Sequence, residues 1–253
     1  MNVRDYIFLL KLKQNNIKMS IYENIKGFFP NSLVDWDGKV SAVIFLGNCN
    51  FRCRYCHNRE LVLEPEKIKA ISFEEIKNYL ERNRDFVDGI VITGGEPTLY
   101  PDLKDLLSEF KKMGLKIKLE TNGSNPEMLK NLVDAGLVDF VAMDIKTCFD
   151  KYKEIIGVDV DIEKIKESIH IVKSFPAYEF RITLFPEIKQ EDFEEIFKYF
   201  KENNINNLFL QQFRAENCVD SKADDVKPYS KEEISGFLEL AKKYLGRAGV
   251  RNL

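Results

Sequence analysis

The chain alternates between short apolar runs, which are typical of β-strands, and longer amphipathic segments, which are typical of α-helices. Helix start signals separate these runs: Ser72 and Ser230 each begin a capping box, and Asn125 before Pro126 fits an N-cap. Six βα units in series, joined by right-handed crossovers, predict a parallel sheet in an α/β fold. The six strand-like runs are Val40–Leu46, Gly89–Thr93, Lys116–Thr121, Phe140–Ile145, Glu179–Leu184 and Asn207–Gln212.

Length and composition fit one globular domain. The 253 residues suffice for a substantial core, and the net charge of −3 gives no basic footprint for nucleic acid. No apolar stretch approaches the ~18 residues that a membrane span needs. Five cysteines, three of them clustered, favour metal chemistry in a reducing cytoplasm over a disulfide scaffold. We expect residues 1–20 to be an N-terminal extension of unclear role and residues 21–253 to form a single domain.

Within three of the runs, apolar and polar side chains alternate, so each strand has one face of each kind. The helices of a parallel sheet cover the apolar face, which leaves the polar face for the interior. A closed eight-stranded barrel fills its interior with Val, Ile and Leu, whereas this interior is ionic and suits a cavity for a charged ligand. The alternative is a polar face that is simply solvated. The polar face carries Lys118, Glu120, Asn122, Asp144, Lys146, Arg181 and Thr183.

Three cysteines, Cys49, Cys53 and Cys56, follow the first strand with the spacing C-x3-C-x2-C. A [4Fe–4S] cluster normally takes four cysteine ligands, so three would leave one iron open for a substrate or cofactor. Three other interpretations compete. The run from Cys53 to His57 fits the haem c attachment pattern, a zinc site would need a fourth ligand, and buried thiols can be inert.

Other candidate residues also stand where strands end. After the second strand, Gly94 and Gly95 would let the backbone approach a ligand closely, and Glu96 places a fixed anion beside them. The alternative is an ordinary turn into a helix. At the end of the fourth strand, Asp144 and Lys146 point the same way, and they could form an internal ion pair without a ligand.

The cysteine triplet, with the aromatic Tyr55 before its last member, resembles the signature of the radical S-adenosylmethionine (SAM) superfamily. The run Tyr55–Asn58 looks most like glycyl-radical-enzyme activating proteins, in particular those of anaerobic ribonucleotide reductase. The resemblance extends from about Gly27 to about Arg214. It implies an incomplete (β/α)6 barrel with a parallel sheet, one [4Fe–4S] cluster on the three cysteines, and SAM as the second cofactor.

The resemblance also implies a reaction and its partners. The reduced cluster would cleave SAM, and the resulting radical would remove a hydrogen atom from a glycine of a partner enzyme, with a flavodoxin- or ferredoxin-type electron donor. Glu120 stands where the family usually has Asp, which leaves its contact with SAM in question. The residues expected to bind SAM are Tyr55, Gly94, Gly95, Glu96, Glu120, Asn122, Asp144, Lys146 and Arg181.

Two other functions stay open from the sequence. One is a radical SAM enzyme that acts on a small molecule, of the deazapurine-forming type, and the other is a non-catalytic iron–sulfur or zinc protein. The stretch from Arg214 to Tyr229 has little apolar content. We therefore expect it to be a mobile loop that helps to dock the partner, with an ordinary surface connection as the alternative.

Overall fold

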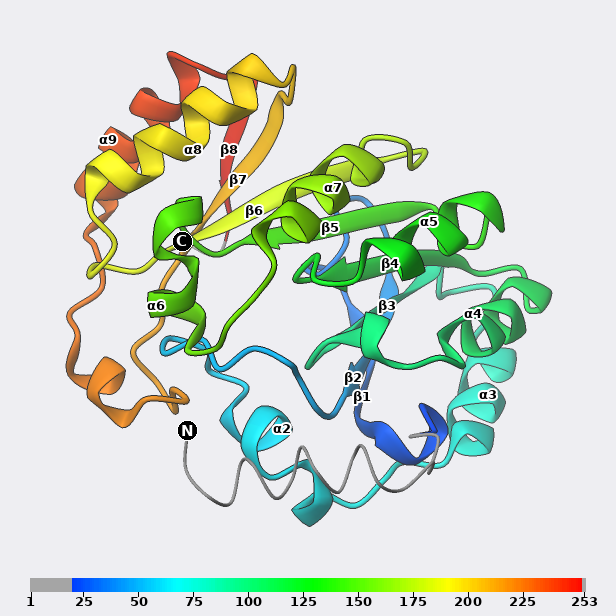
Figure 1. The fold of residues 1–253 in the computed structure, drawn as a ribbon. Coiled ribbons are helices and arrows are strands. Elements are labelled where there is room, and N and C mark those ends of the chain that lie inside the picture. The colour runs from blue at the N-terminus through cyan, green and yellow to red at the C-terminus, as the bar shows by residue number, and fades with distance from the viewer. Residues whose placement is uncertain (1–19, 252–253) are drawn as a thin grey trace.

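The computed structural model describes residues 20–251, which form one curved eight-stranded sheet whose strand order follows the chain, β1 to β8 (Figure 1). All six predicted strands are present as β2 to β7, and they run parallel. The strands are β1 (Ile25–Ser32), β2 (Ser41–Leu46), β3 (Gly89–Gly94), β4 (Lys116–Thr121), β5 (Phe140–Ile145), β6 (Tyr178–Leu184), β7 (Asn207–Gln212) and β8 (Arg247–Arg251).

The sheet has two edge strands that the prediction omitted. β1 pairs with β2 in the antiparallel direction, and β8 adds to β7 in the parallel direction. β1 contains a glycine and a proline, and β8 has only five residues, none of them buried. Neither strand therefore carries the long apolar run that reveals a central strand in a sequence. The sheet is mostly parallel rather than wholly parallel.

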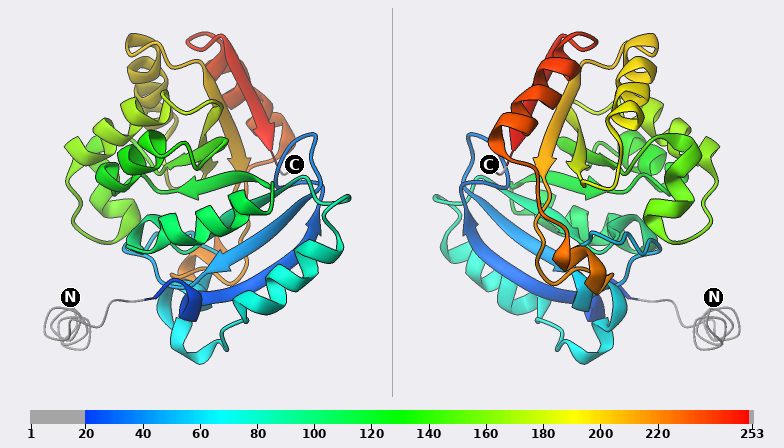
Figure 2. Two further views of the ribbon diagram at one scale, coloured as in Figure 1. Left: turned by 90° about the vertical axis from the view of Figure 1, so that its right-hand side faces the viewer. Right: turned by 90° about the vertical axis from the view of Figure 1, so that its left-hand side faces the viewer.

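The longer helices cover the outer face of the curved sheet, as Figures 1 and 2 show. The predicted N-cap at Asn125 is present, with its side chain accepting from the amide of Met128, and Ser230 forms its capping box. Ser72 precedes α3, but its side chain makes no capping hydrogen bond. The helices are α2 (Arg59–Leu63), α3 (Phe73–Arg82), α4 (Leu103–Lys112), α5 (Pro126–Asp134), α6 (Tyr152–Ile156), α7 (Ile162–Val172), α8 (Gln190–Glu202) and α9 (Lys231–Lys242).

The predicted division of three strands, β4, β5 and β6, into an apolar and a polar face is confirmed. The apolar residues of β4, β5 and β6, such as Leu119, Met143 and Ile182, are completely buried beneath the helices. The polar residues of the same strands line a cavity on the inner face. The interior of this sheet is therefore ionic, and the hydrophobic core lies between the sheet and the helices.

The loop between β1 and β2 closes the floor of the interior. The Trp36 ring packs against Val43, Val91 and Phe140, which all point inward. Gly89 makes room for this ring, since a Cβ atom there would lie 2.9 Å from it. The same loop joins the two sheet edges through an ion pair of 2.7 Å between Asp37 and Arg251 of β8. In the part of the chain that the structure describes, no helix is long and apolar enough to cross a bilayer.

Candidate functional site

A cavity of about 400 Å³ lies inside the curved sheet, at the end where the parallel strands finish. It brings together all the residues predicted as cluster or SAM ligands, although they come from four separate strands and from the loop after β2. Which ligand each residue contacts remains a prediction. The residues are Cys49, Cys53, Tyr55, Cys56, Gly94, Gly95, Glu96, Glu120, Asn122, Asp144, Lys146 and Arg181.

The cysteine loop, residues 47–58, follows β2 and is held by α6 on one side. The amides of Arg52 and Arg54 donate to the carbonyls of Ile156 (2.8 Å) and Ile155 (3.2 Å). Gly157 ends α6 with a φ of +71°, and a Cβ atom there would lie 3.0 Å from the Arg52 carbonyl oxygen. A glycine at this position therefore lets the helix end and the cysteine loop approach each other closely.

The three thiols of this loop are the candidate ligands of a metal centre. Cys49, Cys53 and Cys56 are all free, and burial raises the pKa of Cys49 and Cys53 to about 12. Bound cationic metal would compensate for this burial and favour the thiolates. Within residues 20–251, no three His, Cys, Asp or Glu side chains are grouped around a point that one ion could occupy. Ligands to separate irons of a cluster need not converge on one point.

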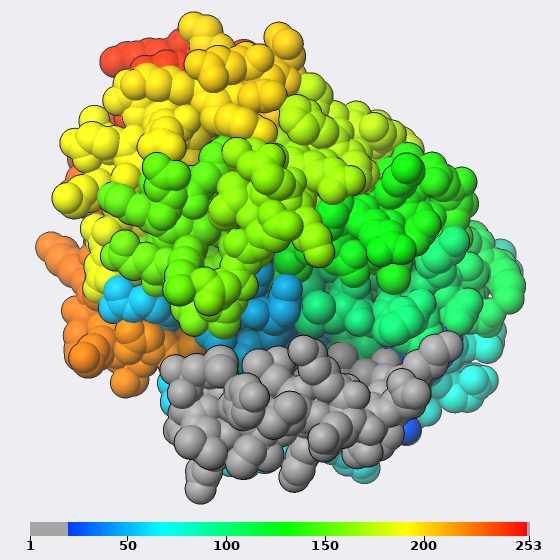
Figure 3. All heavy atoms as spheres, viewed as in Figure 1, coloured from blue at the N-terminus to red at the C-terminus, as the bar shows by residue number. Residues whose placement is uncertain are grey.

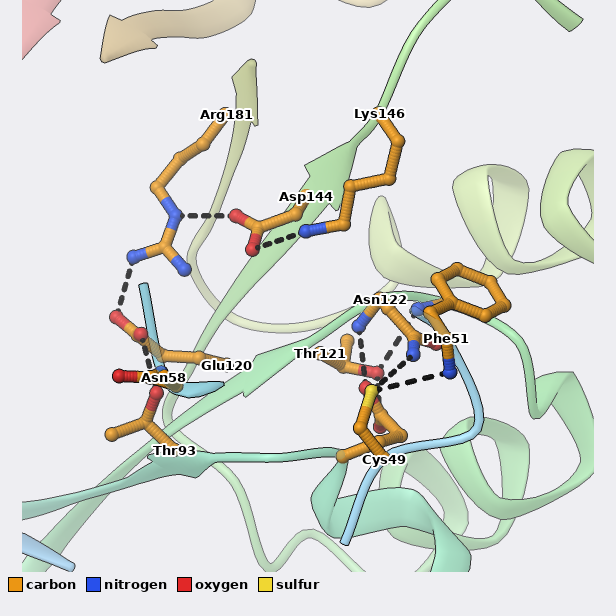
Figure 4. Close-up of polar contacts among 12 residues, drawn as sticks. Cys49, Phe51, Asn58, Thr93, Glu120, Thr121, Asn122, Asp144, Lys146 and Arg181 are labelled. Carbon is orange, nitrogen blue, oxygen red and sulfur yellow. Dashed lines mark hydrogen bonds and ion pairs between the residues drawn. The ribbon is translucent and has the colours of Figure 1, made fainter. Parts of the chain in front are cut away.

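Four charged side chains from three strands form an ion-pair network across the site from Cys49 (Figure 4). Arg181 donates to Asp144 (2.8 Å) and to Glu120 (2.5 Å), and Lys146 donates to Asp144 (3.1 Å). Burial alone would raise the pKa of Asp144, but Arg181 and Lys146 lower it to about 2. Arg181 and Lys118 likewise hold the pKa of Glu120 below its usual value despite its burial. The network therefore stays fully ionised at neutral pH.

A second group of charged side chains lies below this network, next to the Trp36 ring that closes the bottom of the interior. Lys118 is 3% exposed and donates to the carbonyl of Asp35 (2.7 Å), and it lies 3.4 Å from Glu120 and 3.5 Å from Glu179. Arg251 also reaches Glu179, at 2.6 Å. Arg251 was not among the predicted residues, because it stands on the short strand β8. The charged side chains of the inner face therefore form ion pairs with one another instead of being simply solvated.

The two glycines at the end of β3 make close contacts with the protein backbone. Gly94 has a φ of +110°, and a Cβ atom on it would lie 2.5 Å from the backbone of Leu46. A Cβ atom on Gly95 would lie 1.8 Å from the carbonyl oxygen of Asn48. Both residues also line the cavity, and the close approach of their backbone to a ligand stays a prediction. Their missing side chains make room for the start of the cysteine loop.

Glu96 is surrounded by hydrogen-bond donors of the protein. Its side chain is completely buried. Its carboxylate accepts hydrogen bonds from the backbone amides of Thr98 (3.0 Å) and Asn122 (2.7 Å) and from the Thr121 hydroxyl (2.8 Å). Burial raises its pKa, whereas these hydrogen bonds act in the opposite direction. The carboxylate thus joins the end of β3 to the end of β4 and is engaged by protein donors.

Asn122 and Tyr55 connect the strand ends to the cysteine loop. The side-chain amide nitrogen of Asn122 donates to the side chain of Asn50 (2.9 Å) and lies 3.8 Å from the Cys49 sulfur (Figure 4). The Tyr55 ring is buried, and its hydroxyl donates to the carbonyl of Lys146 at 3.4 Å. Their side chains position the loop from two directions.

The post-β7 segment, residues 214–229, is packed against the cysteine loop. It contains a short 3₁₀ helix, and its Cys218 and Ala223 are completely buried. The Val219 amide donates to the carbonyl of Cys56 at 2.9 Å. The expectation that this segment buries little was therefore wrong, because its polar composition concealed two buried anchors and backbone pairing. Its role in docking a partner stays a prediction.

The molecular surface over this region places the cysteine loop next to the post-β7 segment and the chain around α6 (Figure 3). Gln211, Gln212, Phe213 and Arg214, at the end of β7, also line the cavity. The arrangement offers thiol ligands on one wall and a charged, hydrogen-bonding surface on the facing walls. It suits a metal cluster together with a ligand that carries both positive and negative groups.

Comparisons with known proteins agree with this arrangement. The family described as "Radical SAM superfamily" matches residues 43–200, more than half of the chain. A Methanocaldococcus jannaschii protein named "Putative glycyl-radical enzyme activating enzyme" is 35% identical over 236 residues, which cover 90% of this chain and 96% of that protein.

Two further likenesses concern other proteins with part of the same sequence or fold. A 7-carboxy-7-deazaguanine synthase of Neisseria meningitidis is 33% identical over 131 residues, which cover 52% of this chain and 53% of that enzyme. The crystal structure of a domain of pyruvate-formate lyase-activating enzyme from Bacteroides vulgatus aligns with a TM-score of 0.52 and 18% identity, covering 65% of this chain and 99% of that chain.

Proposed function

This chain belongs to the radical SAM superfamily, and on that basis we propose that it is an activating enzyme that installs a glycyl radical on a partner protein. The partner we propose is an anaerobic ribonucleotide reductase, because the run Tyr55–Asn58 resembles its activating proteins. One observation carries the catalytic part of the proposal: three free cysteines and an ionised polar wall face the same cavity.

The cluster ligands in this proposal are Cys49, Cys53 and Cys56. A [4Fe–4S] cluster bound there would supply the electron for reductive cleavage of SAM, and a flavodoxin- or ferredoxin-type protein would supply that electron to the cluster. The protein's own contribution is binding, orientation and exclusion of water. The Trp36 ring helps to exclude water, because it fills the bottom of the interior with apolar contacts.

The ion-pair network orients SAM in this proposal. SAM carries an ammonium, a carboxylate and a sulfonium, so its site must offer both signs of charge. Asp144 and Glu120 provide the anions, and Lys146 and Arg181 provide the cations. Because these groups already hold one another in place, the site needs little rearrangement when the ligand binds.

A radical SAM reaction on a small molecule is the second candidate. The 33% identity to a 7-carboxy-7-deazaguanine synthase over about half of the chain favours it. The two candidates share the cluster and SAM and differ only in what receives the radical.

An anaerobic activation assay separates the two. The reconstituted protein is incubated with SAM, a reductant and the anaerobic ribonucleotide reductase of the same organism, and a glycyl radical is sought by EPR. We expect a radical signal that the Cys53→Ala variant does not produce. SAM cleavage without a glycyl radical, together with a deazapurine product detected by mass spectrometry in a parallel assay that supplies the small-molecule precursor, would instead support the small-molecule reaction.

A further inference from the structure

Arg54 lies between the second and third cysteines and is fixed along its whole length. Its amide donates to the Ile155 carbonyl (3.2 Å), and its own carbonyl accepts from the Asp220 amide (3.0 Å). Its guanidinium donates to the Asp220 carboxylate (2.9 Å) and also to the Glu187 carboxylate. Backbone and side chain are therefore held by the same neighbours.

These partners come from the segments that follow three successive strands. Ile155 follows β5, Glu187 follows β6, and Asp220 follows β7. Next to the arginine, Val219 donates to the carbonyl of Cys56, so the pairing with the post-β7 segment continues to the third cysteine. The stretch from the second to the third cysteine thus lies between α6 on one side and the post-β7 segment on the other.

We propose that Arg54 is a positioning residue that holds the Cys53–Cys56 stretch in its ligating geometry, and that Asp220 and Glu187 act on the cluster through it. The proposal rests on the cluster site of the proposed function. It gives the post-β7 segment a role in retaining the cluster and in tuning its potential. A guanidinium suits this role because its planar fork can bind two carboxylates at once in fixed directions.

Simple surface charge does not explain this arrangement. Isolated exposed ion pairs hold side chains weakly, as expected for the neighbouring pair Lys153–Asp159, whose side chains are 71% and 85% exposed. The Arg54 and Asp220 side chains are only 29% and 28% exposed, and the backbone hydrogen bond between the two residues fixes their separation. The pair is therefore preorganised in a way that the neighbouring pair is not.

The test compares Arg54→Gln and Asp220→Asn with the control Lys153→Gln, which removes the neighbouring exposed pair. All are reconstituted anaerobically, and three quantities are measured: the rate of iron loss to a chelator, the midpoint potential, and the EPR spectrum of the reduced cluster. Thermal unfolding of the metal-free proteins reports on the fold. Arg54→Lys tests rescue, because it restores the charge without the fork.

We expect both variants to lose iron about 10- to 100-fold faster than the wild type, the range for residues that orient metal ligands. We also expect a changed EPR line shape, partial rescue by Arg54→Lys, and no change in the control. If Arg54→Gln fails to fold, Asp220→Asn decides. Wild-type rates and spectra in both variants would overturn the proposal. A wild-type protein that holds its cluster but activates no partner would contradict the proposed function and not this role.

Discussion

Gly94, Gly95 and Glu96 form a motif whose atoms mostly serve the protein itself. The two glycines allow the chain after β3 to contact the backbone of the cysteine loop, and Glu96 binds donors at the end of β4. Opposite them, Asp144 and Arg181 carry charges that are satisfied by each other before any ligand arrives. These residues around the cavity are therefore held in place by contacts within the protein before a ligand binds.

The contact at Gly95 predicts a large effect for a very small substitution. In Gly95→Ala, the new methyl group would meet the Asn48 carbonyl oxygen, and only a backbone shift can relieve the contact. We expect destabilisation of about 3 kcal/mol, at the upper end for overpacking. Urea unfolding of the metal-free protein measures it.

Gly236→Ala is the matched control for that change. Gly236 lies within α9, where no heavy atom stands within 4 Å of the new Cβ position. Alanine there should stabilise the protein by about 0.5–1 kcal/mol, because it favours the helix. Equal effects of the two substitutions would show that the contact at Gly95 is relieved without cost.

The pKa of Asp144 predicts how Arg181→Gln depends on pH. Removing one partner of a buried ion pair should cost about 3–5 kcal/mol at pH 7. Because Arg181 holds the pKa of Asp144 near 2, below its unfolded value, this stabilisation is complete above pH ~4 and is lost as the pH falls toward 2. Urea unfolding between pH 7 and pH 3 should show the difference between wild type and variant shrinking. A constant difference would contradict the assignment.

At the scale of elements, two loops contribute to the interior and to the site that the strands form. The β1–β2 loop seals the interior with Trp36 and joins the sheet edges, and the post-β7 segment supports the cysteine loop. The central strands were predictable because their apolar faces alternate with polar ones. β1, β8 and the post-β7 segment were not, because glycine, proline, short length or polar composition removes that signal, and only contacts distant in sequence order them.

The floor of the interior predicts the effect of Trp36→Ala. This ring is 6% exposed and packs inside the sheet, so its removal leaves a cavity that the surrounding strands cannot close. We expect a loss of about 3–5 kcal/mol in the free energy of unfolding.

Phe86→Ala is the control for this loss, since the Phe86 ring is 57% exposed. It should change the same free energy by no more than about 0.5 kcal/mol. Comparable losses in the two variants would show that the Trp36 ring contributes no more than a surface side chain.

At the scale of the whole molecule, one curved sheet brings residues that are distant in sequence to a single cavity. The sequence was sufficient to predict this gathering, because the carboxyl ends of parallel strands meet at one edge of a sheet. It was not sufficient to separate ligand contacts from structural ones. Glu96 and Gly94 have the residue types of a ligand site, and both also make close contacts within the protein that the sequence does not reveal.

The most direct test of the account is the chemistry of the three cysteines. Wild type, Cys53→Ala and the control Cys148→Ala are reconstituted anaerobically, reduced, and given SAM, and iron content and 5′-deoxyadenosine are measured. Cys148 is buried outside the cysteine loop and does not line the cavity. We predict about four irons per chain and SAM cleavage in the wild type and the control, and neither in Cys53→Ala. A Cys53→Ala variant that keeps its iron and cleaves SAM like the wild type would contradict the account.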